Sequence, residues 1–63
     1  MNLEDIKKGF RNQVAEIVDN YQLLEDLVKN TDPQSEEFSI IKEEMLKEYN
    51  SNYVEELLDQ WAK

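Results

Sequence analysis

The stretch KNTDPQSEEFSII, residues 29–41, holds the only proline of the chain and interrupts its helical pattern. Asp32 followed by Pro33 is typical of an N-cap and the first position of a helix. Ser35 is a rival N-cap two or three residues later, but we favour Asp32. A short connection of this kind, here residues 30–32, brings two helices together in an antiparallel arrangement.

Before this turn, apolar residues recur at steps of three and four. Lys7 interrupts the series, and Asn2 is the expected cap at its start. The spacing predicts one helix over about residues 3–29, nearly 40 Å long at about 1.5 Å per residue. Its apolar stripe consists of Leu3, Phe10, Val14, Ile17, Tyr21, Leu24 and Val28.

After the turn, the apolar residues follow mostly at steps of four. Each such step overshoots a full helical turn by about 40°, so the stripe from Ile41 to Trp61 would rotate roughly 200° around one unbroken helix. Asn52 with Glu55 resembles a capping box. We therefore expect two helices, at about residues 33–49 and 52–62.

These elements predict one all-α domain over residues 1–63, an antiparallel helical hairpin with a short third helix that forms a small three-helix bundle. A chain of 63 residues buries only roughly 60% of the surface that its unfolded form exposes. It contains no cysteine and no histidine, so disulfides and ordinary zinc sites cannot reinforce it. We therefore expect it to self-associate or to bind a protein partner.

The charge of the chain is strongly negative, at −8, and is unevenly distributed. Residues 1–15 carry two acids and three bases, whereas residues 16–63 carry thirteen acids and four bases. Such a balance repels nucleic-acid phosphates and anionic lipid surfaces. We expect no direct binding to nucleic acid or membranes, and we interpret Lys7, Lys8 and Arg11 as balancing nearby acids.

The first ten residues do not resemble a secretory signal, and no apolar run approaches the ~18 residues of a membrane span. These features predict a cytoplasmic protein. Six lysines against one arginine are typical of an AT-rich genome, which suggests a bacterial or phage origin.

No motif predicts catalysis or metal binding. An EF-hand loop starting at Asp32 would place Glu37 where a glycine must make the sharp turn. The adjacent glutamates at 36–37, 43–44 and 55–56 point about 100° apart on a helix and are typical of a solvated face. The serines have no histidine or cysteine partner. We predict that the chain is not an enzyme and has no cofactor.

The sequence therefore predicts a small protein–protein interaction module, a regulator, adaptor or assembly subunit that acts through an apolar helix face. The alternative is an acidic inhibitor that mimics nucleic acid and blocks a basic nucleic-acid-binding protein. The predicted partner-binding residues are Tyr21, Leu24, Val28, Phe38, Ile41, Met45, Tyr49, Leu58 and Trp61, although in a monomeric bundle most of them would be core. The predicted acidic face consists of Glu43, Glu44, Glu48, Glu55, Glu56 and Asp59.

Overall fold

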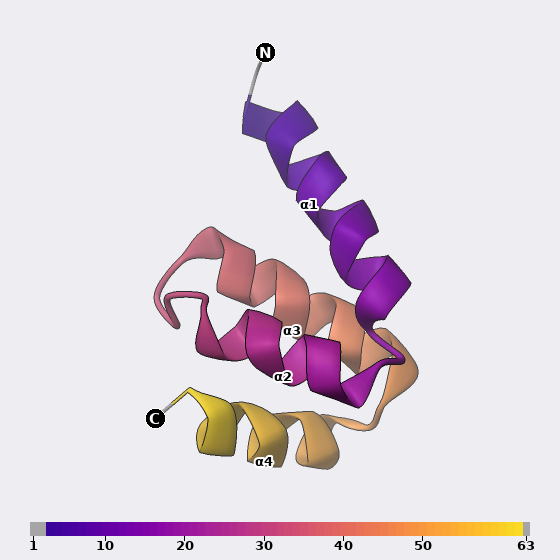
Figure 1. The fold of residues 1–63 in the computed structure, drawn as a ribbon, viewed down its shortest axis with the longest axis vertical. Coiled ribbons are helices and arrows are strands. Elements are labelled where there is room, and N and C mark those ends of the chain that lie inside the picture. The colour runs from indigo at the N-terminus through magenta and orange to yellow at the C-terminus, as the bar shows by residue number, and fades with distance from the viewer. Residues whose placement is uncertain (1–2, 63) are drawn as a thin grey trace.

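The computed structural model describes residues 3–62, which form four α-helices and no strand. The helices are α1 (Leu3–Ile17), α2 (Tyr21–Lys29), α3 (Glu36–Glu48) and α4 (Ser51–Trp61). The predicted all-α class is confirmed for this part of the chain, but the predicted number of three helices is wrong. In Figure 1, α2, α3 and α4 lie together while the N-terminal half of α1 projects away from them.

The predicted single helix over residues 3–29 is broken, because α1 ends at Ile17 and α2 begins at Tyr21. Asn20 is the N-cap of α2, and its Oδ1 accepts a hydrogen bond of 3.2 Å from the backbone N–H of Leu23. Its own N–H donates to the carbonyl of Ile17 at 2.8 Å. An unbroken helix of this length would measure about 40 Å, more than the 35 Å longest dimension of the molecule. The break lets both halves contribute to one core.

A long-range hydrogen bond joins the turn between α1 and α2 to the second half of the chain. Val18 lies in the turn and is buried, and its carbonyl accepts a hydrogen bond of 2.8 Å from the hydroxyl of Tyr49. Tyr49 is itself the C-cap of α3. The end of α1 and the end of α3 are therefore held against each other.

The predicted break in the second half is confirmed, since α3 ends at Glu48 and α4 begins at Ser51. The cap, however, is Asn50 and not Asn52. The Oδ1 of Asn50 accepts a hydrogen bond of 2.8 Å from the backbone N–H of Tyr53. Asn52 lies inside the first turn of α4.

The connection between α2 and α3 is longer than predicted and spans residues 30–35. Ser35 is the N-cap of α3, and its Oγ accepts a hydrogen bond of 3.3 Å from the backbone N–H of Phe38. The preferred cap, Asp32, instead accepts a hydrogen bond of 3.0 Å from the N–H of Gln34 within the loop. The rival cap was therefore the correct one, and α3 begins three residues later than expected.

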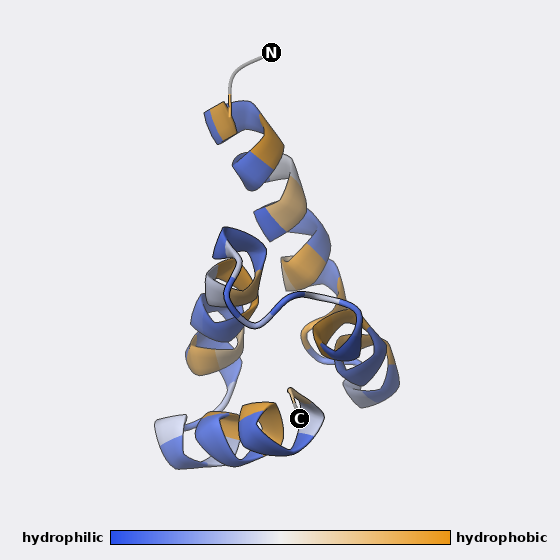
Figure 2. Ribbon diagram, turned by 90° about the vertical axis from the view of Figure 1, so that its left-hand side faces the viewer, coloured by the Kyte–Doolittle hydropathy of each residue, from blue (hydrophilic) through white to orange (hydrophobic). Residues whose placement is uncertain are grey.

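The core lies where the four helices meet. α1 packs most extensively against α3 and also contacts α2, while α4 packs against both α2 and α3. Hydrophobic and hydrophilic segments alternate along the helices (Figure 2). The buried cluster consists of Val14, Val18, Leu24, Val28, Ile41, Met45, Val54, Leu57, Leu58 and Trp61.

Candidate interaction surfaces

Six of the nine predicted partner-binding residues are core residues in this structure. Their exposed fractions are at most 7%, and they are Leu24, Val28, Ile41, Met45, Leu58 and Trp61. Side chains buried to this degree hold the helices together and present almost no surface to a second molecule.

The other three predicted residues reach the surface to different degrees. Tyr21 is 51% exposed, and its ring packs edge-on against Trp61 with the ring centroids 5.2 Å apart. Phe38 and Tyr49 are half-buried and pack against the core. The Tyr49 ring also lies 5.6 Å from that of Tyr53.

The most exposed large apolar side chains lie at the free end of α1. Leu3 is 63% exposed and Ile6 is 54% exposed, in the part of α1 that extends beyond the other helices (Figures 1 and 2). The predicted partner-binding set contained neither residue, although Leu3 was predicted to begin the apolar stripe. The interruption of the stripe at Lys7 was the signal that this end lacks a complete packing partner.

These side chains open onto a groove between α1 and the start of α3. A salt bridge of 2.7 Å between Lys7 Nζ and Glu36 Oε2 crosses its rim. Apart from its neighbours in sequence and the backbone of its own helix, nothing lies within 4 Å of the position that a Cβ at Gly9 would occupy, so the surface of α1 is open there. The groove is lined by Leu3, Ile6, Lys7, Phe10, Glu36, Glu37 and Ile40.

Two members of the predicted acidic face form salt bridges with basic side chains of this chain. Arg11 reaches both carboxylates, with Nη1 2.9 Å from Glu44 Oε2 and Nη2 3.4 Å from Glu43 Oε2. Lys47 Nζ lies 3.0 Å from the same Glu44 oxygen. Glu43 still lies on the surface, with 53% of its side chain exposed, whereas Glu44, with 7% of its side chain exposed, is buried and does not belong to an exposed face.

The environment of Glu44 favours its ionised form. The hydrogen bond from Lys47 lowers the pKa of Glu44, burial raises it, and the hydrogen bond from Arg11 lowers it again, so that the net shift is downward. Because Arg11 lies on α1 and Glu44 on α3, this ion pair joins the two helices that pack most extensively.

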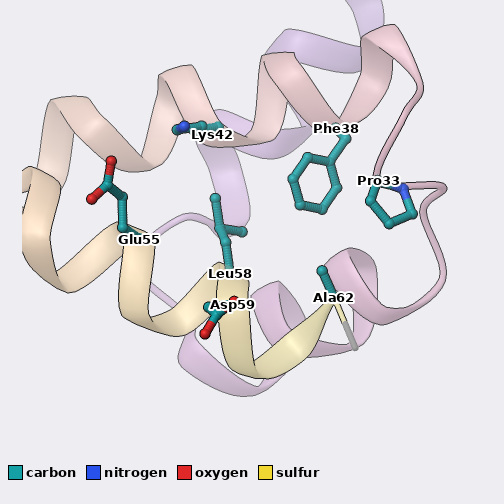
Figure 3. A pocket seen from close by; sticks show the side chains of 7 residues that line it. All are labelled: Pro33, Phe38, Lys42, Glu55, Leu58, Asp59 and Ala62. Atoms are coloured by element: carbon teal, nitrogen blue, oxygen red, sulfur yellow. The ribbon is translucent and has the colours of Figure 1, made fainter.

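The remaining members of the predicted acidic face, Glu48, Glu55, Glu56 and Asp59, are exposed. The last three line a shallow hollow on α4 together with Asn52. A cleft of about 310 Å³ lies beside it, between α3 and α4 (Figure 3). The second half of the molecule therefore presents acidic groups next to a partly apolar depression.

A comparison with models of protein families, with curated proteins and with solved structures finds no match for this chain. Within residues 3–62, none of the helices has both the length and the apolar character needed to cross a membrane. The same part of the chain contains no group of three or more acidic side chains placed to hold a metal ion.

Proposed function

We propose that this protein is a small acidic helical protein–protein interaction module that docks a helix of a partner protein on the N-terminal half of α1. The observation that carries the proposal is the placement of Leu3 and Ile6, which are more exposed than any other large apolar side chain in residues 3–62. Large apolar side chains that gather at one exposed place mark an interaction site more often than scattered ones do.

The form of the surface favours a helix as the occupant. Leu3, Ile6 and Phe10 follow each other at steps of three and four, so they form one ridge on α1. The groove between this ridge and Ile40 of α3 resembles the grooves into which a third helix packs its own ridge. Gly9, in the same part of α1, has no side chain that could obstruct such a helix.

The energetics require an interface larger than two side chains. Full burial of a leucine or isoleucine contributes about 1.5–3 kcal/mol, and only the exposed fractions, 63% of Leu3 and 54% of Ile6, remain to be buried here. Association costs about 4–15 kcal/mol in lost freedom of motion. The partner must therefore also contact the groove lined by Phe10 and Ile40 and form polar contacts at its rim.

The test compares two double variants that carry the same chemical change. Leu3→Glu with Ile6→Glu places two charges on the proposed docking face, whereas Leu23→Glu with Leu46→Glu places them on exposed apolar residues of α2 and α3. Each chain is immobilised and exposed to an extract of the source cell, and the captured proteins are quantified by mass spectrometry. We expect the unaltered chain to capture a specific partner protein. The variant with Leu3→Glu and Ile6→Glu should no longer capture it, whereas the variant with Leu23→Glu and Leu46→Glu should still do so.

Far-UV circular dichroism must show the same helix content in both variants. The proposal fails if the captured proteins do not differ between the two pairs. Sedimentation equilibrium across a dilution series tests the predicted self-association. If the 7.5 kDa chain forms a dimer that dissociates only when Leu3 and Ile6 are changed, the molecule that docks on α1 is a second copy of this chain and not a partner helix.

The nucleic-acid-mimicking inhibitor is the second candidate, and the exposed acids on α3 and α4 favour it. Pairing of Glu43 and Glu44 with Arg11 and Lys47 leaves fewer carboxylates for this role. A complex held by charge should weaken steeply as salt rises from ~50 to 200 mM, whereas apolar docking on α1 should hardly respond. The salt dependence of the captured complex therefore separates the two candidates.

A further inference from the structure

The cleft between α3 and α4 combines an apolar floor with charged edges. Phe38 of α3 and Leu58 of α4 point into it from opposite sides (Figure 3). Pro33 and Ala62 close one end. Its volume of about 310 Å³ is at the lower limit of the ~300–1,000 Å³ that ligand pockets span. It therefore suits a side chain of a partner protein better than a whole small molecule.

The wall of this cleft on α4 is negatively charged. No basic residue occurs between Ser51 and Trp61, whereas Glu55, Glu56 and Asp59 all lie in this helix. The opposite wall, on α3, carries Lys42 (Figure 3), so the three acidic side chains of the cleft and the hollow outnumber one basic side chain. Glu55 and Asp59 line both the cleft and the shallow acidic hollow on α4. The apolar floor and the acidic hollow therefore form one continuous surface, which we call the α4 surface.

We propose that the α4 surface binds a cationic amphipathic helix of a partner protein. One large apolar side chain of that helix enters the cleft between Phe38 and Leu58. Lysine or arginine residues one turn away lie beside Glu55 and Glu56. Because residues three and four apart share a helix face, a short helix presents both kinds of side chain to the α4 surface at once.

Charge complementarity decides the occupant. A nucleic acid would meet the carboxylates of α4 with its own phosphates and be repelled. A second copy of this chain carries the same net charge of −8, so the two copies repel each other as they approach. A cationic partner helix instead gains from long-range attraction before it makes contact.

The experiment uses the full chain and a synthetic lysine–leucine peptide of about four helical turns, with its leucines on one face. A control peptide has the same composition, but its leucines are distributed around the helix. Titration calorimetry measures binding of both peptides. Backbone NMR of the protein shows where the first peptide binds, with the expected shifts at Phe38, Leu58 and Ala62.

Two charge reversals of equal size test the site. Glu55→Lys with Glu56→Lys should weaken binding of the amphipathic peptide about tenfold, because two exposed attractions become repulsions. Glu16→Lys with Asp26→Lys changes the net charge equally on exposed positions of α1 and α2 and should weaken it less than about threefold.

Equal losses for the two charge-reversed pairs, or equal binding of the two peptides, would overturn the proposal, since either result means nonspecific attraction to an acidic protein. Shifts confined to α1 would also overturn it. The Leu3→Glu and Ile6→Glu variant should bind the peptide like the unaltered chain. Failure at the α4 surface is thereby distinguished from failure of the docking face on α1.

Discussion

Glu44 is a buried carboxylate that faces two cations. Only 7% of its side chain is exposed, and Arg11 and Lys47 both donate to its Oε2, at 2.9 and 3.0 Å. Glu43 contacts the same arginine at 3.4 Å but is 53% exposed. The two adjacent glutamates therefore provide a matched comparison of a buried and a solvated ion pair.

We expect Glu44→Gln to lower the free energy of unfolding by about 1–2 kcal/mol, because it removes charge-assisted hydrogen bonds from a buried site. Glu43→Gln should cost less than about 0.5 kcal/mol, since water screens this pair. Urea unfolding of the three chains measures both values. Equal losses would mean that the burial of Glu44 is unimportant.

The contribution of Glu44 should depend on pH in one direction. Its pKa is lower in the folded chain than its ordinary value of 4.5, so the folded state binds this proton less readily than the unfolded state does. The stabilisation is fully present above the unfolded-state pKa and is lost as the pH falls through the folded-state pKa.

The difference in unfolding free energy between the unaltered chain and Glu44→Gln should therefore be constant near neutral pH. It should begin to shrink below about pH 5. Urea titrations at a series of pH values measure this difference. A difference that grows on acidification would contradict the assigned direction.

At the scale of the elements, capping residues decided where the helices begin. The apolar spacing predicted helix content and the break near residue 50, because both follow from the angle between side chains on a helix. It missed the break after Ile17, because the steps from Val14 through Ile17 to Tyr21 also fit a continuous helix. The polar pair Asp19–Asn20 was the available signal, since asparagine favours N-caps and turns.

The caps of α4 give a direct test. Asn50→Ala should destabilise the fold by about 1 kcal/mol, because the N–H of Tyr53 loses its acceptor. Asn52→Ala, inside the first turn, should leave stability unchanged or raise it slightly, since alanine is the better helix former. Thermal unfolding followed by circular dichroism compares the two. If Asn52→Ala destabilised the fold more than Asn50→Ala, Asn52 and not Asn50 would be the N-cap of α4.

The turn between α1 and α2 depends on a side chain that is distant in sequence. Tyr49→Phe removes only the hydroxyl that donates to the Val18 carbonyl, and it should cost about 1 kcal/mol. Tyr53→Phe is the control, because Tyr53 is 40% exposed. Chemical denaturation measures both. If Tyr49→Phe had no effect, water would replace the hydroxyl without loss.

At the scale of the whole molecule, the sequence could not distinguish core residues from contact residues. An apolar stripe requires burial, but its period is the same whether the covering surface belongs to the same chain or to another. Four helices bury Leu24, Ile41 and Met45 almost completely. The uncovered apolar surface is instead greatest at Leu3 and Ile6, because α1 extends beyond the helices that pack against it (Figure 1).

The stability of the whole fold should depend on Trp61 in α4, which is 5% exposed. Trp61→Ala should cost about 3–5 kcal/mol, which approaches the total stability of roughly 3–9 kcal/mol expected at about 0.05–0.15 kcal/mol per residue. Its far-UV circular dichroism should therefore show substantial loss of helix. The Tyr21→Ala variant, altered at a half-exposed position, should lose much less helix content. A fully helical Trp61→Ala chain would show that α4 is dispensable.

Trp61 is also the only tryptophan of the chain, and Tyr21 of α2 lies edge-on against it at 5.2 Å. Light absorbed by tyrosine at this separation passes to the indole, whose emission colour depends on how much water surrounds it. The fluorescence of Trp61 therefore reports, without a label, how closely α4 is packed in the core. Stopped-flow fluorescence can follow the loosening of that packing without any added dye.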